Sequence, residues 1–198
     1  MRVKILATAA VMLAMTGCGG GGGGGYTVQI KLTPTTASTY PGATTQFVAA
    51  IQNVVTPRIV WSVQEGAAGG TVDTSGLYTA PASAGTYHVV ASGPLYNNAQ
   101  STSTVVVHVK VSATPHVVTS SVSQSIKFSA SVAGTPNQNV TWSIQEGAAG
   151  GTIDSSGNYV APATPGIYHV VATSVFEPAQ ADVATIAVGY GGASGSIN

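Results

Sequence analysis

Apolar and polar residues alternate with a period of two along most of the chain, in short runs separated by Gly, Pro, Asn and Ser. Val, Ile, Thr and Tyr dominate these runs, and no window repeats its apolar residues with the 3.6-residue period of an amphipathic helix. Short alternating runs between turn residues are typical of half-buried β-strands. The pattern predicts an all-β protein, with strands near residues 27–33, 44–52, 58–64, 70–73, 76–79, 85–92 and 102–110, and again near 110–115, 125–133, 139–145, 151–154, 157–160, 166–174 and 181–188.

The chain contains one sequence unit written twice. Residues 61–91 and 142–172 are nearly identical, and the distance between equivalent residues is 81 positions, as from Trp61 to Trp142. Further on, Ala99-Gln100 resembles Ala179-Gln180, an offset of 80, which predicts one extra loop residue in the first unit. We therefore expect two tandem domains and a flexible C-terminal tail, with bounds of 26–110, 111–188 and 189–198.

The alternation also assigns an inner face to each unit. We expect each Trp to lie buried between two sheets, with one Phe and one Tyr beside it. Seven short strands with a central Trp and a late Gly-x-Tyr-x-apolar motif are typical of an immunoglobulin-like β-sandwich. The predicted core aromatics are Phe47, Trp61 and Tyr87 in the first unit and Phe128, Trp142 and Tyr168 in the second.

Both units resemble the bacterial Ig-like domains of the group 2 and invasin/intimin-like type. The resemblance covers nearly all of residues 27–188 and implies Ig-like sandwiches used as extracytoplasmic spacers, adhesin stalks or accessory modules. It also implies that Phe47 and Val89 take the places of the antibody-domain disulfide, and that Tyr87 and Tyr168 are tyrosine corners. The motifs that carry it are Val60–Val63, Gly70–Pro81 and Gly85–Ala91, with Val140–Ser143, Gly151–Pro162 and Gly166–Ala172 in the second unit.

The N-terminus has the pattern of a signal peptide. Arg2 and Lys4 precede an apolar run, residues 5–15, that is too short to span a bilayer stably. Residues 13–18, Leu-Ala-Met-Thr-Gly-Cys, resemble the lipobox of bacterial lipoproteins. That resemblance implies cleavage between Gly17 and Cys18, which leaves residues 1–17 as the signal peptide, and acylation of Cys18 with fatty acids such as palmitate. The alternative is an ordinary secretory signal followed by an incidental Cys.

Seven glycines at positions 19–25 separate Cys18 from the first unit. Such a run forms no stable element and predicts a flexible tether, 18–25, with a reach of roughly 15 Å. A lipid on Cys18 would make the membrane a partner of the protein. An Asp directly after the acylated Cys would favour retention in the inner membrane. Position 19 is Gly instead, which favours the outer membrane or cell surface.

Composition excludes several classes of function. Charged residues make up 6% of the chain and the net charge is zero, so no basic surface exists for nucleic acid. The single Cys excludes an intrachain disulfide and a cysteine zinc cluster. With six acidic residues and four histidines in all, we expect no catalytic centre, no cofactor and no metal centre.

Two sets of polar residues are candidates for chemistry. Glu65 and Asp73, repeated as Glu146 and Asp154, flank a glycine-rich loop and can supply part of a calcium site, although Asp can equally serve the tight turn that follows. The histidines are His88 and His169, at equivalent outward positions, and His108 and His116, which can lie on one side of the junction or simply face solvent.

These patterns predict a non-enzymatic surface lipoprotein that acts as a spacer or as an adhesion module toward a protein or glycan. The run from Val105 to Val111 has no Gly, Ser or Pro linker, which predicts a stiff end-to-end rod. One alternative is a subunit of a larger envelope assembly that uses an exposed strand edge. Another is a carbohydrate-binding module, for which the candidate exposed aromatics are scattered: Tyr26, Tyr40, Tyr96 and Tyr190.

Overall fold

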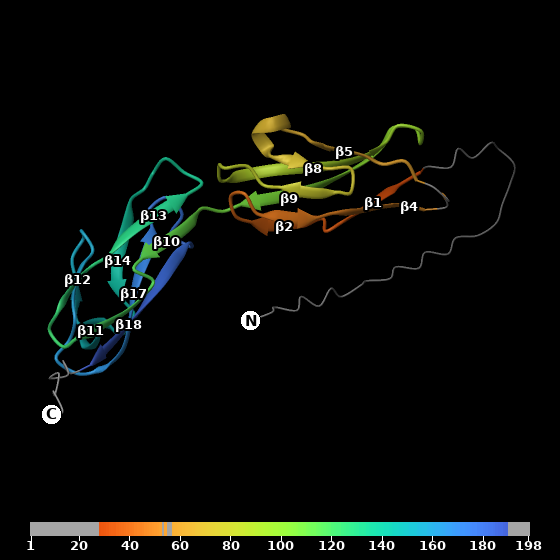
Figure 1. Ribbon diagram of the computed structural model, residues 1–198. Helices are drawn as coiled ribbons and strands as arrows, with labels where there is room; N and C mark the ends of the chain where they lie inside the picture. Colours follow the sequence, from red (N-terminus) through yellow and green to blue (C-terminus); the bar gives the residue numbers. More distant parts are fainter. Residues whose placement is uncertain (1–27, 53, 55–56, 190–198) are drawn as a thin grey trace, which may run out of the picture.

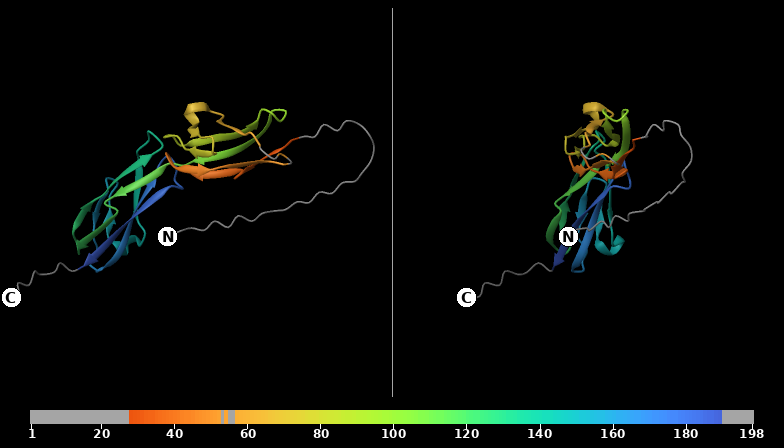
Figure 2. Two further views of the ribbon diagram at one scale, coloured as in Figure 1. Left: turned by 45° about the vertical axis from the view of Figure 1, so that its right-hand side comes forward. Right: turned by 90° about the vertical axis from the view of Figure 1, so that its right-hand side faces the viewer.

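A computed structural model describes residues 28–52, 54 and 57–189, which form two β-sandwiches arranged end to end (Figure 1). The predicted all-β class is confirmed, since the only helices among the described residues are two short 3-10 turns. Gly17, Cys18 and the glycine tether lie outside the described residues, as do residues 190–198. Figure 2 shows from two further directions that the sandwiches follow one another, with a bend between their long axes.

The first sandwich has one continuous four-stranded sheet, in the order β2-β9-β8-β5, facing two smaller pieces, β1-β4 and β3-β7-β6. All its strand pairs are antiparallel except β2 with β9. Its elements are β1 (Ile30–Thr33), β2 (Thr36–Thr39), β3 (Thr44–Gln46), β4 (Val48–Ile51), β5 (Val60–Val63), η1 (Gly66–Gly69), β6 (Thr71–Val72), β7 (Leu77–Thr79), β8 (Gly85–Gly93) and β9 (Ala99–Val107).

The second sandwich repeats this topology, with a sheet β11-β18-β17-β14 facing β10-β13 and β12-β16-β15. Gly189, expected in the tail, ends β18, and Lys110, expected in the first unit, begins β10. The elements are β10 (Lys110–Thr114), β11 (Val117–Ser121), β12 (Ser125–Lys127), β13 (Ser129–Ala133), β14 (Val140–Ile144), η2 (Gly147–Gly150), β15 (Thr152–Ile153), β16 (Asn158–Val160), β17 (Gly166–Ser174) and β18 (Ala181–Gly189).

The alternation did not predict β2 and β11, the strands that follow Pro34 and Pro115. Each proline lacks a backbone N–H and ends the preceding strand, after which the chain crosses to the other sheet. There it pairs in parallel with the last strand of the unit: Thr36–Thr39 lies along β9. These short segments are rich in Thr and Ser, so their apolar signal is weak.

The inferred change of offset from 81 to 80 is wrong. Tyr87 pairs with Val105, and Tyr168 pairs with Ile186, so the last strands of the two units keep the offset of 81. A shift of one residue would turn every side chain of the strand to the opposite face. Burial selects the register that places Val105 and Ile186 inside the sandwiches, and the local likeness of Ala99-Gln100 to Ala179-Gln180 has no structural counterpart.

Tyr78 and Tyr159, which the sequence analysis did not place in the core, are its largest fully buried side chains. The rings of Tyr78 and the buried Phe47 pack edge to face, with 6.2 Å between their centroids. The Tyr78 hydroxyl donates a hydrogen bond to the carbonyl of Gly69 at 2.7 Å. Phe128 and Tyr159 repeat the ring pair at 6.0 Å. The hydrogen bond from its hydroxyl allows a tyrosine to occupy a fully buried site.

Trp61 and Trp142 are half-buried, which corrects the expectation that they lie fully buried between the sheets. Both sit on edge strands, β5 and β14, that have only one neighbour in the sheet. A Cβ on Gly76 would come within 2.7 Å of the Trp61 ring, so the turn after Asp73 closes directly over the indole. Phe47, Phe128, Tyr168 and Val89 are buried, and Tyr87 is half-buried.

Each sandwich has its own hydrophobic cluster, and all members of both clusters lie between Val28 and Val188. A chain that begins at residue 26 therefore contains every member that these two clusters have among the described residues. In the part of the chain that the structure describes, no helix is long and apolar enough to cross a membrane.

Candidate functional site

Every histidine of the chain is paired with a carboxylate through its Nδ1 atom. Within each unit the pair joins the loop after β5 or β14 to the middle of the neighbouring long strand. The Nδ1 to Oε1 distance is 2.7 Å from His88 to Glu65 and 2.6 Å from His169 to Glu146. The second carboxylate oxygen accepts the backbone N–H of the same histidine at 3.0 Å in both units. We call a glutamate that pairs with a histidine ring through one oxygen and accepts a nearby backbone N–H through the other a carboxylate bracket; in these two brackets the N–H belongs to the same histidine.

The loop that presents this glutamate has the same sequence in both units, Gln-Glu-Gly-Ala-Ala-Gly-Gly, and two of its glycines lie where a side chain would clash. A Cβ on Gly70 would come within 2.3 Å of the Thr79 carbonyl, and its φ of 97° is a value that disfavours other residues. A Cβ on Gly69 would come within 2.6 Å of Val63. The glycines let the loop fold back against the sheet and position Glu65.

The predicted calcium candidates are used in other ways. Partial burial raises the pKa of Glu65, but hydrogen bonds from the His88 ring and backbone outweigh this and hold that pKa below its ordinary value. Asp73 Oδ1 accepts backbone N–H groups of Ser75 and Leu77 at 2.8 and 3.0 Å, which makes it a turn residue. Asp154 repeats this arrangement. Among the residues that the structure describes, no group of three or more His, Cys, Asp or Glu side chains comes together.

The tyrosine-corner residues behave as the resemblance implies. The hydroxyl of Tyr87 donates to the carbonyl of Ser83 at 3.1 Å, and the hydroxyl of Tyr168 donates to the carbonyl of Thr164 at 2.9 Å. Both bonds return to the backbone four residues upstream and fasten the connection that leads into β8 or β17. The corners are structural features of the two sandwiches.

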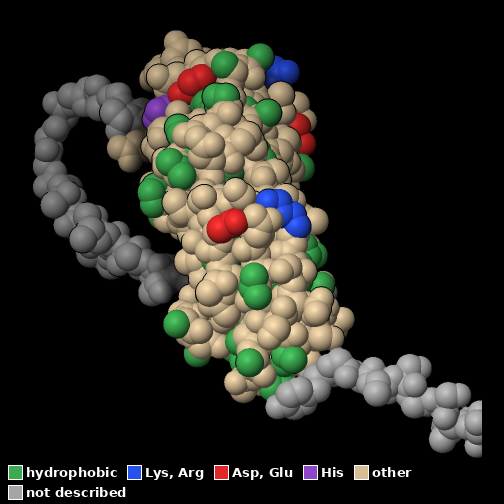
Figure 3. Space-filling view, turned by 90° about the vertical axis from the view of Figure 1, so that its left-hand side faces the viewer, with side chains coloured by type: hydrophobic (Ala, Val, Ile, Leu, Met, Phe, Trp, Pro, Cys, Tyr) green, Lys and Arg blue, Asp and Glu red, His purple; other side chains and the backbone are tan. Residues whose placement is uncertain are grey.

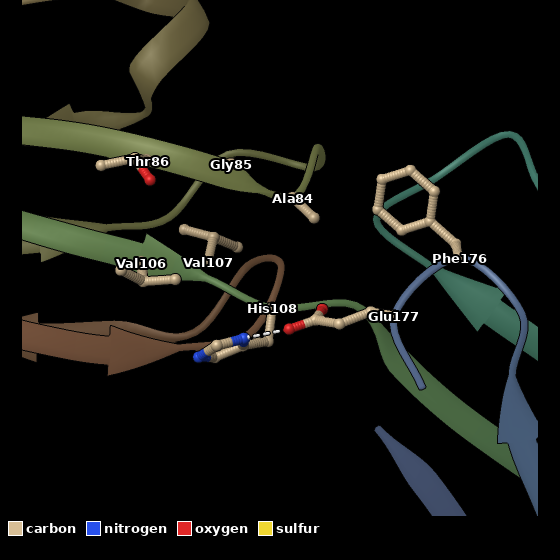
Figure 4. A pocket seen from close by; sticks show the side chains of 8 residues that line it. All are labelled: Ala84, Gly85, Thr86, Val106, Val107, His108, Phe176 and Glu177. Carbon is tan, nitrogen blue, oxygen red and sulfur yellow. Dashed lines mark hydrogen bonds and ion pairs between the residues drawn. The ribbon is translucent and has the colours of Figure 1, made fainter. Parts of the chain in front are cut away.

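A third carboxylate bracket lies at the junction of the two units. Only His108 and Val109 separate β9 from β10, so the link is two residues long. Glu177, from the loop between β17 and β18, reaches back to this link: Oε1 lies 2.5 Å from His108 Nδ1, and Oε2 accepts the Val109 N–H at 3.0 Å. Figure 4 shows the two side chains pointing toward each other across the junction. A side chain of the second unit thus binds both residues of the link that leads into it.

Two further hydrogen bonds join the two units. The backbone N–H of Ala84 in the first unit donates to the carbonyl of Gly134 in the second at 2.8 Å. The Tyr40 hydroxyl lies 3.3 Å from the amide oxygen of Gln180. Two separate loops of the second unit, one with Glu177 and Gln180 and one with Gly134, therefore contact the end of the first unit, which restricts rotation about the link.

A shallow pocket of about 220 Å³ opens beside the bracket, and its lining is mainly apolar (Figure 4). Phe176, from the same loop as Glu177, faces Ala84 across it and remains more than half exposed. The lining residues are Ala84, Gly85, Thr86, Val106, Val107, His108, Phe176 and Glu177.

The fourth histidine belongs to the second unit alone. His116 Nδ1 lies 3.4 Å from Asp182 Oδ2, which also accepts the Ala113 N–H at 2.8 Å. His108 and His116 therefore pair with different acids of the second unit and do not converge on one site. Glu177 has Tyr96 as its counterpart in the first unit, and this exchange of a tyrosine for an acid was the sequence signal that could have revealed the junction bracket.

Of the four aromatic residues considered for carbohydrate binding, the structure describes Tyr40 and Tyr96. Tyr96 is half-buried and packs against the first hydrophobic cluster, and Tyr40 lies at the junction, where its ring centroid is 6.5 Å from that of His108. Tyr26 and Tyr190 lie outside the described residues. The arrangement among the described residues corrects the idea that Tyr96 is free to stack on a sugar.

Comparison with known proteins gives structural neighbours only. No family model matches the chain, and no curated protein matches it. The chain is similar to protocadherin gamma B7 extracellular cadherin domains 1–4, with 11% identity over 82% of this chain and 51% of that one and a TM-score of 0.35. It is also similar to mouse cadherin-23 EC22–24, with 13% identity over 83% of this chain and 65% of that one and a TM-score of 0.34.

A bacterial neighbour is the set of fibronectin(III)-like modules of Clostridium thermocellum CbhA, with 17% identity over 86% of this chain and 98% of that one and a TM-score of 0.29. The chain spans about half the length of the protocadherin it matches. These likenesses concern the fold alone. The strand order described above shows that both units are β-sandwiches.

Proposed function

We propose that this protein is a non-enzymatic, lipid-anchored spacer of the bacterial cell envelope, built from two Ig-like domains of the group 2 and invasin/intimin-like type. The carrying observation is the junction, where Glu177 binds both residues of a two-residue link. A linker without glycine, braced by a side chain of the next domain, keeps two sandwiches in a fixed end-to-end relation. Such stiffness serves a spacer that holds a binding surface away from a membrane.

The dimensions support this role. A nine-residue strand such as β8 or β17 spans about 30 Å, so two sandwiches in series reach about 60 Å. A chain of seven glycines, 19–25, would let this rod pivot at the membrane while the rod itself stays stiff. Acylation of Cys18 would anchor the N-terminal end, with the outer membrane or cell surface as the favoured location and a protein or glycan as the partner.

The polar side chains favour this function over an enzymatic one. The histidine rings are held by carboxylates that also accept backbone N–H groups, and this arrangement fastens loops and the domain junction. The pocket beside the junction is shallow and mainly apolar. These features stabilise the shape of the protein and need no bound cofactor.

Two measurements test the proposal. Mass spectrometry of the protein from bacterial membranes should find an acylated Cys18 as the first residue, and Cys18→Ala should release the protein or leave it unprocessed. Small-angle scattering from residues 26–198 should give an elongated particle of one shape. Another mature N-terminus would overturn the anchor, and a compact side-by-side particle would overturn the spacer.

A second function, as a subunit of a larger envelope assembly, is favoured by one observation. The strands β5 and β14 are sheet edges with one hydrogen-bonded neighbour each, and their free edges can pair with a strand from another protein. Crosslinking from a photoreactive residue at Ser62 or Ser143, both exposed on these strands, would capture such a partner in the native envelope. If no defined partner is captured from either edge, the assembly role is contradicted and the spacer remains as the proposed function.

A further inference from the structure

The first sandwich has a free end, opposite the second sandwich, that we call the N-terminal pole. It is formed by the loop 94–98 between β8 and β9, the start of β1 and the residues that lead into β5 (Figure 1). A Cβ on Gly93, beside that loop, would come within 3.4 Å of the Ile30 side chain, so β1 begins at this pole. The glycine run 19–25 lies a few residues before β1 in the sequence. In a lipid-anchored protein, this pole is therefore the part of the rod nearest the membrane.

The loop at the N-terminal pole presents an apolar side chain to solvent. Leu95 is 68% exposed. Its equivalent in the second unit, 81 positions later, is Phe176, which faces Ala84 of the first unit across the junction pocket (Figure 4). In the second unit, this loop position thus faces the body that lies beyond the pole. By the same geometry, Leu95 faces whatever lies beyond the pole of the first unit.

Two exposed cationic side chains accompany this leucine. Lys31 follows Ile30 directly on β1. Arg58 lies two residues before Val60, which pairs with Ser92, so the antiparallel register directs Arg58 toward the loop 94–98. Every ion pair among the described residues involves a histidine, so neither cation is paired with an acid there.

The two acids of the first unit lie elsewhere. Glu65 is bound to His88, which lies about 16 Å along β8 from the pole. Asp73 is occupied by backbone N–H groups of its own turn. Figure 3 shows, on one side of the molecule, how few and how isolated the charged side chains are. In so weakly charged a protein, two cations without an acid give the N-terminal pole a positive charge.

The duplication provides an internal comparison for these charges. The second unit has Ser112 and Asn139 at the positions equivalent to Lys31 and Arg58. That pole contacts the first sandwich, and both replacements are uncharged. The cations are therefore present only on the unit whose pole does not face another sandwich. This difference points to a negatively charged partner at the N-terminal pole.

We propose that the N-terminal pole binds the surface of a bilayer that contains anionic phospholipids. Leu95 inserts at the level of the headgroups, and Lys31 and Arg58 pair with lipid phosphates. Burial of an apolar side chain at this depth and attraction of cations to an anionic surface both favour the contact. A seated pole would direct the rod away from the membrane, which the glycine run alone would not do.

This proposal rests on the proposed lipid anchor. One leucine and two cations are too few to retain a freely diffusing protein at a membrane. A tether with a reach of roughly 15 Å holds the pole close to the surface, where a weak contact is sufficient.

The single cysteine allows a test with an artificial anchor. Residues 18–198 are coupled through Cys18 to a maleimide-bearing lipid in vesicles of phosphatidylethanolamine and phosphatidylglycerol. Relative to the chain capped with a water-soluble maleimide, acetylation of Lys31 by an amine-reactive reagent should slow about fivefold. Lys127, in the second unit, should keep its rate. Mass spectrometry of peptides measures both rates on the native side chains.

Tryptophan fluorescence measures the insertion of the loop. Leu95→Trp adds a third tryptophan at the pole, and lipids with brominated acyl chains should quench up to about one third of its total emission. Phe176→Trp is the matched control, because it places the same ring on the equivalent loop about 30 Å further along the rod. Its emission should not be quenched.

The role of the cations is tested in the Leu95→Trp chain. Adding Lys31→Ser and Arg58→Asn, which copies the second unit, should lower the ratio of seated to free pole at least about tenfold. Adding Lys110→Ser and Lys127→Asn instead removes the same charge from the second unit and should leave the quenching unchanged. Circular dichroism should show that all variants stay folded.

Three results would overturn the proposal. The first is an equal rate of Lys31 acetylation with and without vesicles. The second is equal quenching of the two loop variants, which would mean that the rod lies flat. The third is unchanged quenching after loss of Lys31 and Arg58, or on vesicles of phosphatidylcholine alone. Because the anchor is supplied chemically, none of these results bears on the acylation of Cys18, which mass spectrometry of the protein from bacterial membranes decides.

Discussion

Ser103 and Ala184 occupy the same place in the two sandwiches, and both are completely buried. Ser103 lies opposite Val89 in the ladder between β8 and β9, and Ala184 lies opposite Val170 between β17 and β18. The Ser103 hydroxyl has no hydrogen-bond partner among the described residues. The first core thus buries an unsatisfied polar group where the second has a methyl group.

Ser103→Ala should therefore stabilise the first unit by about 1 kcal/mol. The variant no longer buries a hydroxyl that has lost its hydrogen bonds to water on folding. The matched change Ala184→Ser should destabilise the second unit by about 1–3 kcal/mol. Urea unfolding of residues 26–198 carrying each change measures both effects. Destabilisation by Ser103→Ala would contradict the absence of a partner.

A second prediction concerns independence of the two cores. Tyr78→Ala removes a buried ring and a hydrogen bond, and should cost about 3–5 kcal/mol, a large part of the roughly 5–15 kcal/mol of a small domain. The two tryptophans lie one in each unit, so single-tryptophan variants report each unit separately. In a Trp61→Phe background, the fluorescence of Trp142 should show that the second unit keeps its midpoint when Tyr78→Ala unfolds the first.

The control for this experiment is Tyr159→Ala in a Trp142→Phe background, where Trp61 should report an intact first unit. If either variant lowered the unfolding midpoints of both units equally, the two sandwiches would unfold as one cooperative body.

A third prediction addresses the junction. Glu177→Ala removes the acceptors of His108 and of the Val109 N–H, so the two units should sample a wider range of relative orientations. Spin labels at Thr102→Cys and Asn158→Cys, one exposed position in each unit, would give a narrow distance distribution in the native background and a broader one in the variant. Glu65→Ala, which removes the equivalent bracket inside the first unit, is the control and should leave the distribution narrow.

An unchanged distribution in Glu177→Ala would show that the remaining contacts, from Ala84 and Tyr40, suffice to fix the junction. A broad distribution already present in the native background would contradict the stiff spacer.

The brackets also predict acid sensitivity. Partial burial raises the pKa values of Glu65, Glu146 and Glu177, but hydrogen bonds from their histidine partners and from backbone N–H groups outweigh this and lower them. A carboxylate whose pKa is lower in the folded state stabilises the protein fully above its unfolded value, here 4.5. That stability is lost as the pH falls through the lowered pKa, so the free energy of unfolding should decrease below pH 4.5.

Urea titrations at a series of acid pH values measure this decrease. The double variant Glu65→Gln, Glu146→Gln lacks two of the titrating groups and should show a shallower decrease than the native protein. A slope identical to that of the native chain would contradict a stabilising role for these two carboxylates.

Much of the architecture follows from the sequence alone. The alternation of Val, Ile, Thr and Tyr with polar residues determines strands, because one face of each must be buried, and the 81-residue repeat determines two similar sandwiches. The positions of Phe47 and Val89 in the core, and the turn at Asp73, also follow from local pattern and turn chemistry. The sequence pattern at Cys18 predicts the lipid anchor. Such a site is recognised by an enzyme as a linear motif, so the prediction does not depend on the tertiary structure of the chain.

Other features were decided only by contacts between segments far apart in the chain. Burial of Val105 and Ile186 fixed the register of the last strands, where local similarity suggested a one-residue shift, because alternation cannot distinguish two registers until the opposite sheet is present. The half-exposure of Trp61 follows from the edge position of β5, which depends on strand order. Glu177 lies 68 residues from the Val109 N–H that it binds, and only the packing of one sandwich against the end of the other brings that acid to the junction.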